Sequence, residues 1–474
     1  MGGLEIQVVK FSELIFEHNK LRLDAEFFKK ENIQLLSQIK KWKYKRISEI
    51  ASVTDGIHSS IDFCENSEIN LISAKSPKDN YFDLSGNAYI STKQHKENPK
   101  TALRLNDVII STVGTIGNTA VVQQEQLPAN SDRHVGIIRI KENIPAYYLS
   151  TFLNSKYGRF QSLRESTGNV QLSLFVYKIN EMLIPVFDDE FHESIQGQCE
   201  LAHQKLRQSK IVYEQAQNLL LEHLGLKDFN PPLQKVNIKS FSNSFGTSGR
   251  LDAEFYQEKY EGYLKKIQAF NNGFVQIQQE YSQVKSKSKF DLPAYQYIEI
   301  GDVNVSDGSY SFNEVATEDL PANAKIMVKE GDILISTVRP NRGAITVIEH
   351  DRDDLIVSGA FTVLRRKVKS YFNNKFLKVL LRTEIYKDWL LQFNVGTSYP
   401  VIKDEDILNL VIPNVEETIQ TQIADLIRQS NYLRIKSKGL LEKAKKAVEL
   451  AIEKDQESAL DFIKGKQTND CNVH

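Results

Sequence analysis

The chain has little cysteine and no long hydrophobic run. Its 474 residues include only three cysteines, Cys64, Cys199 and Cys471, which lie too far apart in sequence for a zinc knuckle or a framework of disulfide bonds. No run of about 18 apolar residues could span a bilayer, and Glu5 interrupts the apolar segment that a secretory signal would need. We therefore expect a soluble cytoplasmic protein that is not exported and makes no membrane contact.

An excess of charge of either sign is also absent. The chain has 60 Lys and Arg against 61 Asp and Glu, which gives a formal net charge of −1. Hydrophobic residues make up 41% and charged residues 26%, as in a globular chain with a sizeable core. This composition excludes a disordered protein. It also removes any argument from overall basicity, although a nucleic-acid-binding protein needs only a local basic patch.

The motifs of common nucleic-acid enzymes are missing. The sequence has no Gly-rich loop for ATP phosphates and no Glu-x-Lys of the metal-dependent nucleases, and its nine histidines form no pair at metal-ligand spacing. Asn230-Pro-Pro-Leu233 is similar to the Asn-Pro-Pro-aromatic loop of amino-methyltransferases, but Leu233 cannot stack on a base as an aromatic ring would. We interpret it as part of a linker, and we predict no catalytic residue and no metal site.

A repeat of about half the chain length is the strongest positive feature. The heptamer Arg-Leu-Asp-Ala-Glu-Phe-Phe at residues 22–28 returns at residues 250–256 with Tyr as its last residue, a period of 250 − 22 = 228 residues. A duplicated fold must repeat its landmarks in order. Further matched pairs do so: residues 107–113 and 332–338, Gly168 and Gly396, residues 183–185 and 411–413, and residues 193–196 and 417–420. The sequence therefore predicts two similar globular copies, each followed by a long helix.

Each copy is predicted to mix strands and helices. Alternating β-branched residues between Gly, Asn, Pro and Ser clusters indicate short strands, and apolar residues at helical spacing indicate the helices. In the first copy we expect helices at 22–42 and 147–163 and strands at 47–53, 69–73, 107–113, 135–140 and 182–186. In the second we expect helices at 254–270 and 373–393 and strands at 295–303, 332–338 and 360–366.

The helix after each copy carries a heptad seam. The first seam contains Ile195, Cys199, Ala202, Leu206, Ser209, Tyr213, Ala216 and Leu220, and the second aligns with it at an offset of 417 − 193 = 224 residues. In this alignment Ser209 corresponds to Leu433, and Leu206 corresponds to Ser430. We therefore interpret the seams as two unlike helices that pack on each other within one chain. Two ordinary core-facing helices remain the alternative. The predicted parts are 1–187, a first domain; 188–225, a helix; 226–249, a linker; 250–415, a second domain; 416–463, a helix; and 464–474, a loose tail.

The two copies agree in their strands and helices but differ in their loops, as expected of two binding heads on one scaffold. Arg339, Asn341 and Arg342 bring to one loop the groups that read guanine and adenine edges in the major groove. The equivalent Gly114-Thr-Ile-Gly117 could suggest a phosphate loop, but we interpret both as turns between paired strands. For the lysines, a solvated surface is the open alternative. The candidate DNA-binding residues are Lys75, Lys78, Lys93, Asn130, Arg133, His134, Asn169, Gln171, Lys285, Lys287, Lys289, Arg339, Asn341, Arg342, Ser398 and Tyr399.

Two heads on two paired helices also predict a spacing. About 30 paired residues would separate the heads by on the order of 45 Å, which is roughly 13 base pairs of duplex. Both heads could then reach the same face of the DNA. Because the heads differ, the recognised DNA sequence, which we call the DNA word, should be split into two different segments and therefore asymmetric.

The chain resembles the specificity subunits of type I restriction-modification systems. The features that carry the resemblance are the two heptamers, the Asn/Gly-Asp-hydrophobic-Ser-Thr-Val strands, the Ile-Pro elements and the two long helices. The resemblance implies an α+β fold with two similar strand-rich target-recognition domains in an internal pseudo-twofold repeat. Two long antiparallel helices would join them as a coiled-coil spacer. It also implies a non-catalytic chain that binds double-stranded DNA, two methyltransferase subunits and restriction endonuclease subunits. S-adenosylmethionine, ATP and Mg²⁺ would belong to those partners, with no cofactor in this chain.

Three other interpretations stay open on the sequence. The chain could be a self-contained adenine methyltransferase with atypical motifs, or a scaffold whose heads bind proteins. It could also serve a system in which one partner chain both cuts and methylates. The DNA word itself, its gap, and the division of loop residues between bases and phosphates are not predicted.

Overall fold

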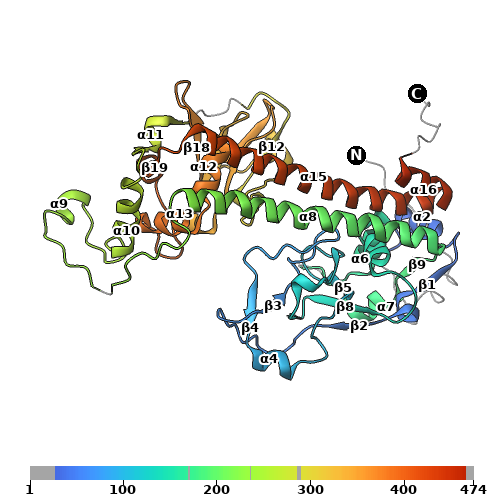
Figure 1. Ribbon diagram of the computed structural model, residues 1–474. Helices are drawn as coiled ribbons and strands as arrows, with labels where there is room; N and C mark the ends of the chain where they lie inside the picture. The colour runs from blue at the N-terminus through green and yellow to red at the C-terminus, as the bar shows by residue number, and fades with distance from the viewer. Residues whose placement is uncertain (1–26, 169–170, 235, 286–289, 466–474) are drawn as a thin grey trace. The chain divides into compact units, whose positions relative to one another are not determined.

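The structure is a computed structural model that describes residues 27–168, 171–234, 236–285 and 290–465. The chain divides into two compact units. Unit 1 comprises Met1–Leu206 and Arg434–His474, and unit 2 comprises Arg207–Leu433. The division falls within both long helices, α8 (Asp189–His223) and α15 (Glu417–Glu453), so each helix contributes one part to unit 1 and the other part to unit 2 (Figure 1).

Unit 1 contains the first copy of the repeat. Before α8 its elements are α2 (Lys30–Ile39), β1 (Tyr44–Arg46), α3 (Ile47–Ile50), β2 (Ala51–Asp55), β3 (Ile69–Ile72), β4 (Ala88–Ile90), α4 (Thr92–Glu97), β5 (Val108–Ser111), β6 (Thr119–Val121), η1 (Gln124–Gln126), β7 (Ala129–Ser131), β8 (Val135–Ile140), α5 (Ala146–Asn154), α6 (Lys156–Glu165), α7 (Val176–Glu181) and β9 (Leu183–Pro185). The end of α15 and α16 (Gln456–Lys464) complete the unit.

Unit 2 contains the second copy. Between α8 and α15 its elements are α9 (Phe245–Ser248), α10 (Glu258–Gln268), β10 (Phe274–Gln276), α11 (Ile277–Glu280), β11 (Tyr281–Gln283), β12 (Ala294–Ile298), η2 (Ile300–Asp302), β13 (Asn313–Ala316), η3 (Thr317–Asp319), β14 (Ala324–Met327), β15 (Ile333–Ser336), η4 (Pro340–Arg342), β16 (Ile345–Val347), β17 (Leu355–Ser358), β18 (Phe361–Arg366), α12 (Asn374–Leu381), α13 (Glu384–Leu390), η5 (Leu391–Phe393), α14 (Asp404–Asn409) and β19 (Val411–Pro413).

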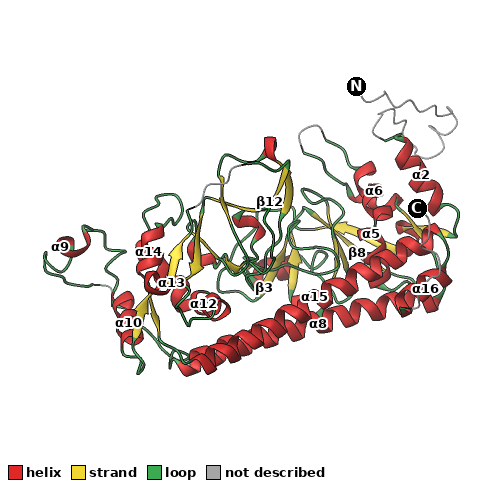
Figure 2. Ribbon diagram, turned by 90° about the horizontal axis from the view of Figure 1, so that it is seen from above, coloured by secondary structure: helices red, strands yellow, loops and turns green. Residues whose placement is uncertain are grey.

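The main sheet and the two-stranded ribbon have the same topology in the two units. The main sheet has the order β2-β8-β5-β6 in unit 1 and β11-β18-β15-β16 in unit 2, and a two-stranded ribbon pairs β1 with β9 and β10 with β19. The remaining sheet is β4-β3-β7 in unit 1 and β13-β12-β17-β14 in unit 2, so β14 is an addition. Figure 2 shows the strands and the helices that accompany them. The α+β class and the duplication predicted from the sequence are therefore confirmed.

The matched strand motifs have a common structural cause. The residue before each motif, Asn106 or Gly331, has a positive φ of 68° or 87°, a conformation that Asn and Gly tolerate best. The aspartate that follows accepts two hydrogen bonds from an arginine on the neighbouring strand. Asp107 accepts them from Arg139 at 2.9 and 2.7 Å. The motif thus fixes a turn and a buried carboxylate, which explains its survival in both copies.

The equivalent pair in unit 2 has nearly the same geometry. Asp332 accepts hydrogen bonds from Arg365 at 2.8 and 2.7 Å. Each aspartate also accepts a hydrogen bond from a backbone N–H three residues earlier, from Arg104 at 2.8 Å or Lys329 at 2.9 Å. The side-chain hydrogen bonds to Asp107 and Asp332 raise the pKa of Arg139 and of Arg365, so both guanidiniums stay charged.

Several predicted elements differ in detail. Residues 47–53 begin with the short helix α3 before β2, and the helix predicted at 147–163 is two helices. The chain turns sharply between α5 and α6 at Ser155, where a Cβ on Gly158 would lie 2.4 Å from the carbonyl oxygen of Leu153. In unit 2, Thr383 caps the start of α13 by accepting a hydrogen bond from the N–H of Tyr386, which divides the helix predicted at 373–393. Close approach at Gly158 and capping by Thr383 accompany the two helix breaks, and apolar periodicity reveals neither.

The long helices pack in antiparallel fashion within each unit. In unit 1 the start of α8, with Ile195 and Cys199, shares a hydrophobic core with Ala444 and Ala447 from the second half of α15. Trp42 lies against the same helix and donates a hydrogen bond from Nε1 to the carbonyl oxygen of Ile452 at 3.0 Å. The small residues at the contact allow the two helix backbones to approach closely.

In unit 2 the polar residues of the seams meet each other. Ser209 donates a hydrogen bond to the carbonyl oxygen of Ser430, and Ser430 donates one to that of Ser209, both at 2.8 Å. The reciprocal pair explains why buried serines are tolerated in both seams. Beyond it, the end of α8 packs on the start of α15 in a common core. The second long helix is shorter than predicted, because it ends at Glu453 and Asp455 caps the separate helix α16.

Candidate nucleic-acid interface

In unit 2 an exposed arginine-rich turn joins β15 to β16. The two strands are antiparallel, and the turn between them contains the single helical turn η4. Arg339, Asn341 and Arg342, three of the predicted DNA-binding residues, are exposed on this turn. Arg339 has φ 49° and ψ 53°, a left-handed conformation that is uncommon outside glycine. Gly343 ends the turn with φ 77°.

A second loop, residues 394–402, lies against this hairpin. Val338 and Val401 form a β-bridge, and the N–H of Arg339 donates a hydrogen bond to the carbonyl oxygen of Pro400 at 2.7 Å. The guanidinium carbon of Arg339 lies 5.4 Å from the centre of the Tyr399 ring, within the range of a cation–π contact. Tyr399 is 47% exposed and Ser398 is also exposed. The structure thus brings together residues about 60 positions apart.

Unit 1 builds the same pair of loops from different residues. The tip of its β5–β6 hairpin has Gly114 with φ 72° where unit 2 has Arg339, and Gly117 with φ 82° where unit 2 has Gly343. A β-bridge between Val113 and Ser173 joins the hairpin to the second loop. Sharp turns between paired strands are therefore confirmed for both hairpin tips.

The second loop is shaped in both units by a glycine with no room for a side chain. A Cβ on Gly168 would lie 2.2 Å from the carbonyl oxygen of Gln171, and a Cβ on Gly396 would lie 2.1 Å from that of Tyr399. Gln171 and Tyr399 therefore occupy equivalent places in equivalent loops, and both are exposed. Asn169, predicted beside Gln171, lies outside the described residues.

The repeated heptamer anchors this second loop in unit 2. Arg250 donates two hydrogen bonds to Asp252, at 2.8 and 2.6 Å, and a third to the carbonyl oxygen of Asn394 at 2.8 Å. Its guanidinium carbon also lies 4.6 Å from the centre of the Phe255 ring. The hydrogen bonds from Arg250 lower the pKa of Asp252, so the pair stays ionised. Sequence reasoning found the heptamer but not this role, although its strict repetition was the available signal.

In unit 1 most of the heptamer lies outside the described residues, but its end makes the matching contact. Arg164 on α6 donates a hydrogen bond to the carbonyl oxygen of Phe27 at 3.1 Å and lies 3.6 Å from the centre of its ring. In unit 2 Gln392 donates the equivalent bond to the carbonyl oxygen of Phe255 at 3.0 Å. Both units thus fasten the heptamer to the helix that leads into the second loop.

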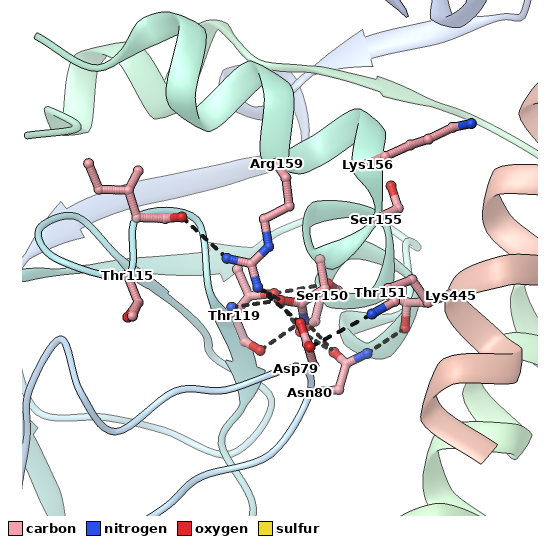
Figure 3. A network of polar contacts seen from close by, with 12 residues as sticks. Asp79, Asn80, Thr115, Thr119, Ser150, Thr151, Ser155, Lys156, Arg159 and Lys445 are labelled. Carbon is pink, nitrogen blue, oxygen red and sulfur yellow. Dashed lines mark hydrogen bonds and ion pairs between the residues drawn. The ribbon is translucent and has the colours of Figure 1, made fainter. Parts of the chain in front are cut away.

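An arginine supports the hairpin tip in each unit, half-buried in unit 1 and buried in unit 2. In unit 1 Arg159 donates a hydrogen bond to the carbonyl oxygen of Ile116 at 3.2 Å. It donates another to the carboxylate of Asp79 at 2.9 Å (Figure 3). Burial lowers the pKa of Arg159, and Asp79 opposes that shift. Lys445 of α15 lies 3.7 Å from the same carboxylate. The tip is thereby tied to a long helix.

Around this arginine, Figure 3 shows a buried network that holds the loop after β3. Asn80, which has φ 62° and is 2% exposed, donates a hydrogen bond to Thr151 at 3.0 Å and accepts one from Ser150. Asn154 donates to the carbonyl oxygen of Thr119 at 2.9 Å and accepts from its N–H at 3.0 Å. Each group in this network is satisfied by the protein, so we assign it to support and not to recognition.

In unit 2 Arg382 supports the tip. It is 5% exposed and donates hydrogen bonds to the carbonyl oxygens of Gly343 and Val305, the second at 3.0 Å. Its Nε donates to the hydroxyl of Tyr213 on α8 at 2.8 Å. These three hydrogen bonds are all made to groups inside unit 2. This residue is therefore a support for the candidate site, and sequence reasoning missed it.

Asn130, one of the predicted site residues of unit 1, serves the fold instead. Asn130 is fully buried and donates hydrogen bonds to Asn98 and Thr101, at 3.1 and 2.8 Å, so its amide is unavailable to a base. His134 is 44% exposed and lies 3.4 Å from Asp132. The sequence signal, a run of polar residues before a strand, did not distinguish inward from outward positions.

The predicted cations of unit 1 are on the surface. Lys75, Lys93 and Arg133 are exposed and Lys78 is half-buried. Lys93 lies 4.0 Å from Glu97, one helical turn away. Among the described residues no ion pair or hydrogen bond joins these four side chains into a cluster, and their positions fit a solvated surface.

In unit 2 Lys285 borders an open basic hollow of about 460 Å³. Arg365, Arg366 and Lys367 also line it; Arg365 pairs with Asp332, and the other two donate hydrogen bonds to backbone carbonyls. The backbone partners leave positive charge in the hollow, which suits a phosphate contact. The predicted Lys287 and Lys289 lie outside the described residues.

Two negative findings hold for the described ranges. They contain no group of three or more His, Cys, Asp or Glu side chains that could hold a metal ion. None of the helices in those ranges combines the length and the apolar character needed to cross a bilayer.

Comparison with known proteins gives two curated relatives. Over 145 residues the chain is 28% identical to the type I restriction enzyme HindI specificity subunit of Haemophilus influenzae, a match covering 29% of this chain and 31% of that protein. Over 287 residues it is 24% identical to the type I restriction enzyme MjaVIII specificity subunit of Methanocaldococcus jannaschii, covering 52% and 66%. The matches thus span about a third and about two thirds of these relatives. No family model matches the chain.

Solved structures described as S or HsdS subunits align over most of the chain. The S subunit of a type I restriction-modification system from M. genitalium covers 89% of this chain and 96% of its own, with 11% identity and a TM-score of 0.39. The HsdS subunit from Thermoanaerobacter tengcongensis covers 90% and 97%, with 14% identity and a TM-score of 0.27. The chain is thus similar in sequence to two type I restriction-enzyme specificity subunits, the proteins that its repeated motifs resemble.

Proposed function

We propose that this chain is the non-catalytic DNA-recognition subunit of a restriction-modification complex. It would read a bipartite, asymmetric target, one half-site with each unit, and position methyltransferase and restriction subunits there. The observation that carries the proposal is the pair of equivalent heads with different tips. Gly114 and Gln171 occupy in unit 1 the places of Arg339 and Tyr399 in unit 2.

The same scaffold with different exposed side chains is what two separate readings require. Direct readout of a base depends on which donors and acceptors a protein presents to the groove. The strands, the buried aspartates and the loop glycines are shared by the two units, so they carry no difference in reading. The tips differ, and each unit should therefore specify its own segment of duplex.

The proposed partners follow from the duplication and the family. Two methyltransferase subunits would dock on surfaces that the repeat presents twice, because nearly identical patches suit identical partners. Restriction endonuclease subunits would join this assembly. S-adenosylmethionine, ATP and Mg²⁺ would be bound by those partners and not by this chain, and the complex would work in the cytoplasm.

The direct test is selection from random duplexes by the full chain in complex with its methyltransferase partner. Sequencing of bound DNA should show two specified segments separated by a gap of fixed length. Affinity should fall as salt rises, since phosphate contacts release counterions. One continuous specified segment, or binding without sequence preference, would contradict the proposal.

The main alternative, a self-contained adenine methyltransferase, has its own test. Isothermal titration of the purified chain with S-adenosylmethionine should give no heat of binding under the proposal. Saturable binding of this methyl donor by the chain alone would favour the alternative. A protein-binding scaffold would instead show no salt-dependent affinity for DNA.

A further inference from the structure

We propose that Arg339 reads a guanine through its major-groove edge in the half-site of unit 2, and that Tyr399 is the positioning residue that orients its guanidinium. This inference rests on the proposed function and names the base that one of its two heads recognises. Four observations carry it: the backbone conformation of Arg339, the contact with Tyr399, the internal use of other arginines, and the equivalent residues of unit 1.

The backbone of Arg339 is in a conformation that favours glycine. Side chains with a Cβ are disfavoured at φ 49° and ψ 53°, because the Cβ crowds the following carbonyl group. Unit 1 has Gly114 with φ 72° at the same place. Unit 2 therefore keeps an arginine where glycine would serve the fold better, and such strain is typical of functional positions.

The hydrogen bonds of Arg339 fix its backbone and leave its guanidinium group, a planar fork of N–H donors, exposed. Its N–H is bonded to the carbonyl oxygen of Pro400, and its carbonyl oxygen accepts from the N–H of Arg342 at 3.0 Å. In the described part of the chain no carboxylate lies within ion-pair distance of its guanidinium. By contrast, Arg250 and Arg382 make their hydrogen bonds inside the unit.

The tyrosine restricts the orientation of the fork. A guanidinium near an aromatic ring keeps its N–H groups available while the ring limits its rotation. Gly396 shapes the loop that carries Tyr399, and that loop is joined to the hairpin by the bridge between Val338 and Val401. Both partners of the contact are therefore held by the same small scaffold.

A fixed planar fork suits a base better than a phosphate alone. Guanine presents O6 and N7 side by side in the major groove, and a bidentate arginine is the commonest specific contact to it. A phosphate contact needs only a mobile point charge, which the lysine-bordered hollow of unit 2 supplies. In unit 1, Gly114 and Gln171 offer no guanidinium, so its half-site should be read by other chemistry.

The first experiment replaces Arg339 by glycine in the full chain and repeats the selection from random duplexes with the methyltransferase partner. Arg339→Gly should weaken binding to the original word by roughly tenfold to a hundredfold. One guanine position of one half-site should become degenerate, while the other half-site stays unchanged. Because glycine suits the backbone, the melting temperature should stay the same or rise.

Arg352→Gln is the matched control. Arg352 is an exposed arginine of the same unit, 41% exposed at its side chain and paired with Asp354, and it lies outside both loops. This variant loses the same charge, so it should change the salt dependence slightly and leave every specified position intact.

The second experiment tests the positioning role of Tyr399. Tyr399→Ala should relax the preference for the same guanine without removing binding, because the charge remains but its orientation is lost. Tyr399→Phe keeps the ring and should retain the preference. If the alanine and phenylalanine variants behave alike, the positioning role is wrong.

The outcomes separate this inference from the proposed function. If Arg339→Gly leaves the selected word unchanged, or weakens all duplexes equally without degeneracy, the guanine reading is overturned while the split word of the wild type still supports the proposed function. If the wild-type complex selects no split word, the proposed function fails, and this inference fails with it.

Discussion

The two units have the same scaffold but present two different sets of exposed residues on it. Strand order, buried aspartates and loop glycines are shared, whereas the tips carry Gly114 and Gln171 in unit 1 and Arg339 and Tyr399 in unit 2. The difference teaches that the parts that shape the loops are separate from the parts that would read DNA. Specificity could then change in one unit without loss of the fold.

The supports beneath the tips show a second kind of difference. In unit 1 Asn154 holds β6 and Arg159 holds the tip, whereas in unit 2 Arg382, at the position equivalent to Asn154, holds the tip itself. Lys387 stands at the position equivalent to Arg159 and pairs with Glu384. The hairpin tip is thus held in each unit by an arginine from a different position, half-buried Arg159 in unit 1 and buried Arg382 in unit 2. The requirement is a donor beneath the tip, not a particular residue.

The largest effect is expected where the units are most alike. Asp107→Asn and Asp332→Asn each leave an arginine without its buried carboxylate, and we expect a loss of about 3 kcal/mol in the free energy of unfolding. The loss should be smaller for Asp332→Asn, because the Arg365 side chain is 43% exposed and that of Arg139 is 24% exposed. Urea unfolding measures both.

The two tryptophans of the chain make this comparison specific. Trp42 lies in unit 1 and Trp389 in unit 2, so a Trp389→Phe background reports on unit 1 and a Trp42→Phe background on unit 2. Asp107→Asn should shift the fluorescence transition of Trp42 and Asp332→Asn that of Trp389. A large loss in one unit and none in the other would show that the motif does not have one common role.

The next effect concerns the two loop glycines. Gly168→Ala and Gly396→Ala each place a Cβ within about 2 Å of a carbonyl oxygen, so the loop must move, at a cost of about 2 kcal/mol. Selection from random duplexes should then show loss of the first half-site for Gly168→Ala and of the second for Gly396→Ala. Loss of both half-sites in either variant would break the assignment of one word segment to each unit.

A smaller effect is expected at the reciprocal serine pair. Ser209→Ala and Ser430→Ala each remove one donor to a buried carbonyl oxygen, which should cost about 1 kcal/mol in unfolding free energy. The two losses should be equal, because the contact is the same from either helix. The double variant should cost less than their sum, since the hydroxyls also contact each other at 3.0 Å. Unequal single losses would contradict reciprocal packing.

The smallest effect is pH dependence in unit 1. Burial lowers the pKa of His192 below 6.5, and Asp189 and Asp188 oppose the shift only in part. Between the two pKa values the unfolded chain binds more protons, so the unfolding free energy should fall as pH drops below about 6.5. His192→Gln should flatten this slope between pH 6.5 and pH 5 in Trp42 fluorescence. An unchanged slope would show that another group causes it.

Unit 2 should lose stability only at lower pH. Glu416 stands at the position equivalent to His192, and hydrogen bonds from its own backbone, Asn272 and His223 lower its pKa below 4.5. A group of this kind stabilises the fold above its unfolded pKa and loses that contribution as pH falls. The Trp389 signal should therefore change at a lower pH than the Trp42 signal.

The sequence predicted the features that repetition and periodicity record. The duplication, strand β8 at its full length and the two long helices follow from apolar patterns and from landmarks that recur in order. The edge strands such as β4 and β13 were missed, because they are short and most of their residues are not buried, which leaves little apolar pattern. The breaks at Ser155 and Thr383 depend on capping and close approach, which no periodicity shows.

The candidate site was predicted in composition but not in arrangement. Arg339 and Tyr399 were both proposed as contacts, yet nothing in their separation in the chain indicated that they touch. Asn130 was proposed because it sits among polar residues, but it lies in β7, where all three residues are buried. Arg382 was not predicted, because a lone arginine at the end of a helix normally lies on the surface. Burial and pairing across loops decide such cases, and both require the folded chain.

The central claim is that each unit reads its own segment of a split DNA word. The most direct measurement is to map methylated bases in the genome of cells that express this chain with its methyltransferase partner. The account predicts one asymmetric word of two specified segments with an unspecified gap of constant length. A single continuous word, or two segments whose gap varies from site to site, would contradict it.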